Sequence, residues 1–224
     1  MTLIELASWV GALATLAAVI VALFKEDFLN WRHYPLLTPR VHLRPPDCHK
    51  TSFNGGLPVY YLRIWIENRG TQRAHQVQVF VSQLLRKHAD GRFHEDLDFL
   101  PMNLRWSHTQ EVFADGISPG MGKHCDLGFV PKPDQAKEAR FASNFAPKKL
   151  ANSNSTWLSL DLEVRPNTET HILESGTYRL ELRVAAANAK PWIEVLEVAL
   201  TGNWFDDQAQ MFSKGIGLVS NPGA

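Results

Sequence analysis

Two pairs of adjacent residues carry side chains that can bind a soft metal ion, Cys48 with His49 and His124 with Cys125. Four such ligands would complete the tetrahedral coordination that zinc prefers. Neighbouring residues of a strand point to opposite faces, however, so all four would converge only if both pairs lay in loops. We therefore favour buried free thiols and packed histidines over a zinc site, and we expect no metal and no other cofactor.

A second group of chemically active side chains is basic and lies in a polar insert, residues 131–155. The insert also carries Phe141 and Phe145, and its candidate contacts for an anion or for lipid headgroups are Lys132, Lys137, Arg140, Lys148 and Lys149. Basic side chains interleaved with aromatic ones suit an anionic membrane surface or a phosphate. The simpler interpretation, which we favour, is a solvated loop, because long connections between strands are often flexible.

Signals of catalysis are weak. The chain has no Gly-x-Ser-x-Gly, no phosphate-binding loop, no His-Glu-x-x-His and no Cys-x-x-Cys. His108 is a single histidine on an alternating stretch, which is more often a surface or packed residue than a site residue. Asp206 and Asp207 could bind a cation, but we expect Trp204 and Phe205 to dock the tail while the two aspartates face water. The sequence therefore predicts a protein that is not an enzyme.

The candidate site residues named above all follow a hydrophobic N-terminal segment. Residues 6–24 contain no charged side chain, and about 20 apolar residues suffice to cross a bilayer as a helix. No basic residue precedes this run, and the residues at its end are bulky, so we expect a retained anchor rather than a cleaved signal peptide. Residues 1–24 are thus predicted to be a transmembrane helix, followed by an interfacial stem at 25–37.

Basic residues follow the anchor and do not precede it, at Lys25, Arg32, Arg40 and Arg44. The positive-inside bias then places the C-terminal domain in the cytoplasm of a single-pass protein of a bacterial inner membrane. Within the anchor, small residues recur on one helical stripe, formed by Ala7, Gly11, Ala14, Ala18 and Ala22. Stripes of this kind let two helices approach closely in lipid, although Ala and Gly are also common in membrane helices for no such reason.

The remaining chain alternates polar and apolar residues with the period of a strand. The clearest stretches are residues 59–67, 77–82, 157–164, 178–184 and 193–200. Eight or nine such strands, without a long helix beyond the anchor, indicate a sandwich of antiparallel sheets. Net charge is zero, with 23 basic and 23 acidic residues, so no nucleic-acid partner is expected.

Two motifs resemble those of bacterial immunoglobulin-like, adhesion-type domains. Residues 62–70 followed by 74–79 read as strand, Asn-x-Gly turn, strand, and Gly176-Thr177-Tyr178 is similar to the entry of a late sandwich strand. The resemblance covers roughly residues 38–201. It implies an immunoglobulin-like antiparallel β-sandwich, mainly β, in which a tyrosine hydroxyl pins a corner by bonding to nearby backbone. It also implies a role in binding other molecules, by analogy.

These observations predict a domain at 38–205 with an insert at 131–155, and a C-terminal tail at 206–224 that packs on the domain or on a partner. The expected function is that of a membrane-anchored, non-enzymatic interaction module, whose partners are membrane lipid and either a second copy of the chain or another protein. The alternative is a membrane sensor whose sandwich binds a small anionic ligand and signals through the anchor helix.

Overall fold

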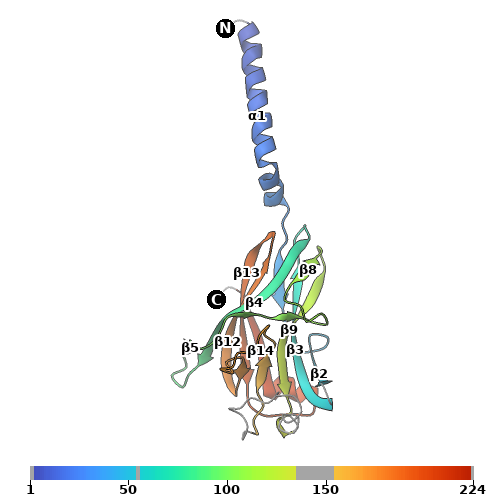
Figure 1. The fold of residues 1–224 in the computed structure, drawn as a ribbon, viewed down its shortest axis with the longest axis vertical. Helices are drawn as coiled ribbons and strands as arrows, with labels where there is room; N and C mark the ends of the chain where they lie inside the picture. Colours follow the sequence, from blue (N-terminus) through green and yellow to red (C-terminus); the bar gives the residue numbers. More distant parts are fainter. Residues whose placement is uncertain (1–2, 54–55, 135–153, 223–224) are drawn as a thin grey trace.

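The protein is described here by a computed structural model that covers residues 3–53, 56–134 and 154–222. A long helix, α1 (Leu3–Arg32), stands away from a β domain (Figure 1). Seven strands form the first sheet: β1 (Leu37–Arg40), β2 (Cys48–Phe53), β3 (Leu57–Asn68), β7 (Arg105–Trp106), β9 (Gly122–Pro131), β10 (Leu158–Leu160) and β11 (Ile172–Leu173).

Seven more strands form the second sheet: β4 (Ala74–Lys87), β5 (Phe93–Glu95), β6 (Met102–Asn103), β8 (Ala114–Ile117), β12 (Gly176–Ala186), β13 (Ala189–Leu200) and β14 (Ile216–Pro222). Neighbours are antiparallel in both sheets, with main orders β1-β3-β9-β10-β11 and β14-β13-β12-β4-β5. Two short helical elements, α3 (Gln208–Gln210) and η3 (Met211–Gly215), precede β14. The prediction of a mainly β fold built from two antiparallel sheets is confirmed.

The core lies between the sheets because each long strand alternates its side chains. Leu62, Ile64 and Ile66 of β3 are at most 2% exposed, and Leu180 and Leu182 of β12 are at most 1% exposed. The residues between them are partly exposed, which is the pattern expected of a strand with one face in the core. The sheets are therefore held together mainly by burial of aliphatic side chains.

The tail belongs to the sandwich rather than lying apart from it. Strand β14 pairs with β13 from Ile216 opposite Leu200 to Pro222 opposite Glu194. Met211 of η3 is fully buried in the same core. The expectation that the tail packs on the domain is thus met, and the second sheet extends beyond the predicted domain boundary at residue 205.

The N-terminal segment is helical where the anchor was predicted. The side chains described in α1 are those of Trp9 and residues 11–25, and all of these are exposed. Within the described part of the chain, no helix is both long and apolar enough to cross a bilayer, so the predicted transmembrane span is not confirmed.

Asn68, at the end of β3, fastens the segment that follows α1 to the sandwich. Its Oδ1 accepts the backbone N–H groups of Leu36 at 3.1 Å and Gly70 at 3.0 Å. Its Nδ2 donates to the carbonyl oxygens of Gln72 at 2.7 Å and Ile117 at 2.9 Å. Since the Asn68 side chain is 0% exposed, these four bonds replace water entirely and give the joint a defined geometry.

Candidate functional site

The predicted helix-pairing stripe lies on the free surface of α1. Gly11, Ala14, Ala18 and Ala22 are exposed, and the side chain of Ala7 lies outside the described ones. No atom lies within 4 Å of the position that a Cβ atom on Gly11 would take. The stripe is therefore open to a second helix, but pairing itself stays a prediction.

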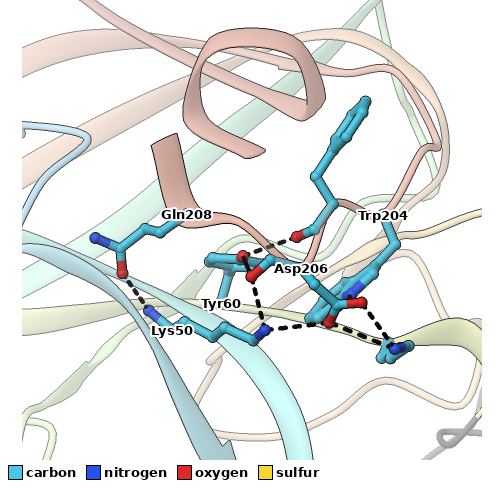
Figure 2. Close-up of polar contacts among 7 residues, drawn as sticks. Lys50, Tyr60, Trp204, Asp206 and Gln208 are labelled. Carbon is cyan, nitrogen blue, oxygen red and sulfur yellow. Dashed lines mark hydrogen bonds and ion pairs between the residues drawn. The ribbon is translucent and has the colours of Figure 1, made fainter. Parts of the chain in front are cut away.

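Among the predicted basic contacts, Lys132 is the one that the structure describes, and it pairs with Asp206. Figure 2 shows the cluster around Asp206. The Nζ atom of Lys132 lies 3.2 Å from Oδ2 of Asp206. Lys50 of β2 reaches the same carboxylate at 3.1 Å and the backbone oxygen of Asp206 at 2.7 Å. The Trp204 indole N–H donates to Oδ1 at 3.1 Å. Three elements distant in sequence thus meet at one carboxylate.

Electrostatics within this cluster favour an ionised Asp206 and a neutral Tyr60. The indole N–H of Trp204, followed by the ammonium groups of Lys50 and Lys132, lowers the pKa of Asp206 well below its usual range. Burial, together with Asp206 and Asp207, raises the pKa of Tyr60 to about 12. The Tyr60 hydroxyl therefore stays protonated at neutral pH.

The same cluster docks the segment that follows β13. The Tyr60 hydroxyl donates to the backbone oxygen of Phe205 at 2.8 Å, and the Tyr60 ring lies 4.9 Å from that of Trp204. Gln208 accepts the backbone N–H of Lys50 at 2.8 Å (Figure 2). Trp204 and Phe205 thus dock this segment as expected. Asp206, predicted to face water, is paired with two lysines while its side chain remains 65% exposed.

Lys132 lies at the end of the sandwich remote from α1. Its neighbour Pro131 pairs with Val59 near the start of β3, whereas Leu37, next to the stem, pairs with Asn68 at the end of β3. At about 3.3 Å per residue, these two ends are about 30 Å apart. Contact of Lys132 with lipid or an anion stays a prediction, and Lys137, Arg140, Lys148 and Lys149 lie outside the described residues.

The two cysteines are buried on either side of β3. Cys48 of β2 pairs with Leu62, and Cys125 of β9 pairs with Ile64. Burial raises the pKa of the Cys48 thiol to about 12 and that of Cys125 well above its ordinary value. In the described residues no three His, Cys, Asp or Glu side chains are placed to hold a metal ion. Both thiols are therefore unreactive core groups.

One polar cluster was not predicted from the sequence, because its members are far apart in the chain. Asp47, 6% exposed, lies between two imidazoles: Oδ2 is 2.9 Å from Nδ1 of His42, and Oδ1 is 2.9 Å from Nε2 of His124. The ring of Trp65 meets that of His124 edge to face at 4.7 Å. With Arg40 and Pro46, these residues line an open hollow of about 230 Å³.

A second unforeseen cluster joins two buried carboxyl groups through one phenol. The Tyr61 hydroxyl lies 3.3 Å from Oδ2 of Asp126 and 3.3 Å from Oδ2 of Asp161. A phenol has a single proton to donate, so the two carboxyl oxygens share it as acceptors. Burial, and then the charge of Asp126, raises the pKa of Asp161.

Asp126 also holds an exposed loop. The Ser107 hydroxyl donates to its Oδ1, and Gln110 Nε2 lies 3.3 Å from its Oδ2. His108 and Gln110 adopt left-handed backbone conformations, with φ of 71° and 61°, which are unfavourable for residues other than glycine. Bonds to the buried Asp126 offset that strain. His108, considered as a site residue, is exposed at the tip of this loop.

Comparison with known proteins adds no family. No protein-family model matches the chain, and no curated protein matches it.

Proposed function

We propose that the protein is a membrane-anchored, non-enzymatic interaction module, in which α1 holds the sandwich at a membrane surface and the module binds a second copy of itself or a protein partner. The observation that carries this proposal is the apolar surface of α1. Leu13, Leu16 and Leu23 are 62%, 56% and 71% exposed, respectively. Large apolar side chains exposed along a helix favour an environment of lipid or of another helix.

Length and sequence support a membrane rather than a groove of another protein. Residues 6–24 carry no charge, and basic residues follow this run but do not precede it. That arrangement favours a single-pass helix in a bacterial inner membrane with the sandwich in the cytoplasm. The joint at Asn68 supports an organising role, because it ties the stem that follows the helix to the sandwich by defined hydrogen bonds.

Self-association is the form of interaction that α1 supports most directly. Small residues on one stripe bring helix backbones close together in lipid. Confinement to a membrane raises the effective concentration of the sandwich domains, so weak contacts between them gain in occupancy. Homo-oligomers formed through the stripe are therefore the first arrangement to test.

We also propose that the sandwich is immunoglobulin-like. In support of this, the hydroxyl of Tyr178 bonds to the backbone of Glu174, four residues upstream, as the resemblance implied for a tyrosine at a sandwich corner. Tyr178 is 4% exposed and follows Gly176, which begins β12. Domains of this class mostly bind other molecules, which agrees with an interaction role by analogy.

Disulfide trapping of the full chain in native membranes tests the proposal. Ala14→Cys and Ala18→Cys lie on the stripe, whereas Leu16→Cys lies on the opposite side of the helix and is the matched control. We expect oxidation to give dimers at the two stripe positions and few at Leu16→Cys. Equal trapping at all three positions, or none at any, would contradict pairing through the stripe.

A further inference from the structure

Four segments meet at the end of the sandwich where the stem joins it. They are the stem at residues 33–36, the turns at 69–73 and 118–121, and the turn between β12 and β13 at 187–190. Figure 1 shows the adjoining ends of β8 and β13 on this side of the molecule. We call this the stem-end surface. We propose that it contacts the headgroups of anionic lipids, an inference that rests on the membrane anchoring proposed above.

Hydrogen bonds fix the four segments relative to one another. The stem bonds to Asn68 through Leu36, and the backbone N–H of Asn68 donates to Met121 at 2.9 Å. Asn188 Nδ2 donates to the backbone oxygen of Arg73 at 2.9 Å, which joins the β12–β13 turn to the turn at 69–73. The stem-end surface is therefore one preformed face and not a set of independent loops.

The charge of this face suits an anionic surface. Its four segments contain Arg69, Arg73, Lys190 and His33, and no Asp or Glu. Arg73 and Lys190 are exposed, and the Arg69 side chain is 51% exposed. Near it, Glu67 pairs with both Arg40 and Arg69, each at 2.8 Å, and Asp115 lies in β8. Basic side chains thus predominate on the face that is next to the stem.

The lengths of α1 and of the stem limit the distance between the stem-end surface and the lipid headgroups. Beyond residue 24 the helix continues to Arg32, which is a rise of about 12 Å. The headgroup layer on each side of a bilayer is about 5–8 Å thick, and screening at physiological ionic strength extends over about 8 Å. Residues 33–36 of the stem add at most about 13 Å, so the exposed basic side chains reach the lipid phosphates when the domain leans toward the bilayer. Met121, 62% exposed at its turn, adds an apolar contact.

The test uses the full chain reconstituted in vesicles of phosphatidylcholine alone or with about one third phosphatidylglycerol. A fluorophore on Ala187→Cys reports the approach of the stem-end surface through quenching by headgroup-spin-labelled lipid. The native Cys48 and Cys125 are buried and do not compete for the label. Flotation of each sample measures anchoring separately.

We expect stronger quenching in anionic than in neutral vesicles, and a decrease as salt is added. The triple variant Arg69→Gln, Arg73→Gln, Lys190→Gln should lower the ratio of docked to undocked domains by about fivefold per charge removed. The control triple variant, Lys87→Gln, Arg92→Gln, Lys214→Gln, removes three exposed charges elsewhere on the sandwich and should leave quenching unchanged.

The two ways of failing are distinguishable. Quenching that is equal in neutral and anionic vesicles, or that falls equally in both triple variants, while the chain still floats, would overturn the lipid contact alone. A chain that does not float with the vesicles would overturn the proposed anchoring as well.

Discussion

The backbone N–H of Leu36 donates to Oδ1 of Asn68 over 3.1 Å, and this bond links the stem after α1 to the end of the longest strand of the first sheet. The same Asn68 side chain bonds to Gln72 in the following turn and to Ile117 at the end of β8, so the stem, β3 and β8 share one buried amide. The position of the stem at Leu36 is thus set by a residue inside the domain.

Asn68→Ala should destabilise the sandwich by about 3 kcal/mol, because it leaves buried backbone groups of Leu36, Gly70 and Ile117 without their partner. Urea unfolding measures the loss. Thr71→Ala, an exposed change in the next turn, keeps its backbone bond to Tyr34 and should cost less than about 0.5 kcal/mol. Equal losses in both variants would show that the amide is not the joint.

Gly70→Ala should loosen the stem for a steric reason. A Cβ atom at this position would collide with the backbone of Tyr34, Pro35 and Leu36, which cannot move as the end of a flexible side chain can. We expect a loss of about 1–3 kcal/mol and faster hydrogen exchange at the Thr71 amide, which bonds to Tyr34. Gly11→Ala, where the space is open, should leave the unfolding of the sandwich unchanged.

The raised pKa of Asp161 predicts a pH dependence of stability with a definite sign. Its pKa is raised above the ordinary 3.8, so the folded state binds the proton more tightly than the unfolded chain does. This contribution to stability is fully present below pH 3.8 and is lost as the pH rises through the raised pKa. Asp161→Asn has a side chain that is neutral at every pH. The free energy of unfolding of this variant should therefore fall less than that of the wild type as the pH rises.

Urea unfolding across a pH series measures this difference between the wild type and Asp161→Asn. Asp126→Asn is the contrasting variant: it deprives Ser107 and Arg63 of a carboxylate and should destabilise the protein at neutral pH. Identical pH slopes for the wild type and Asp161→Asn would show that folding does not raise the pKa of Asp161.

Cys48 and Cys125 should resist thiol reagents in the folded protein. Each is 0% exposed with a raised pKa, so neither the access nor the thiolate that the reaction requires is present. We expect labelling only as urea unfolds the domain, whereas Ala187→Cys, exposed in a turn, should react at once. Rapid labelling of the wild type without urea would contradict the buried placement.

The sequence was sufficient to predict the long strands because each of them has one face in the core. Residues 59–67, 178–184 and 193–200 carry a strand-like pattern and lie within β3, β12 and β13, although Glu194 and not Ile193 is buried. Residues 157–164 alternate equally well, but the strand there is only Leu158–Leu160. Asp161 turns to Tyr61, and Leu162 forms an isolated bridge to Leu104. Alternation specifies which side chains face the core, but not which strand pairs with which.

The polar clusters could not be predicted, since they depend on how strands are paired. Asp47 and His124 are 77 residues apart, and Tyr61 and Asp161 are 100 apart. No local spacing brings such residues together. Docking of Trp204 and Phe205 was predictable, because two large aromatic residues in a tail favour burial. The ion pairs of Asp206 with Lys50 and Lys132 depend on the fold alone.

The central claim is that α1 holds this sandwich in a membrane, and alkaline carbonate extraction of native membranes tests it most directly. We expect the full chain to remain in the membrane pellet. Leu16→Lys with Ile20→Lys places two charges in the apolar run, each costing about 3 kcal/mol at the centre of a bilayer, and should shift the chain to the supernatant. Release of the wild-type chain by carbonate would contradict the account.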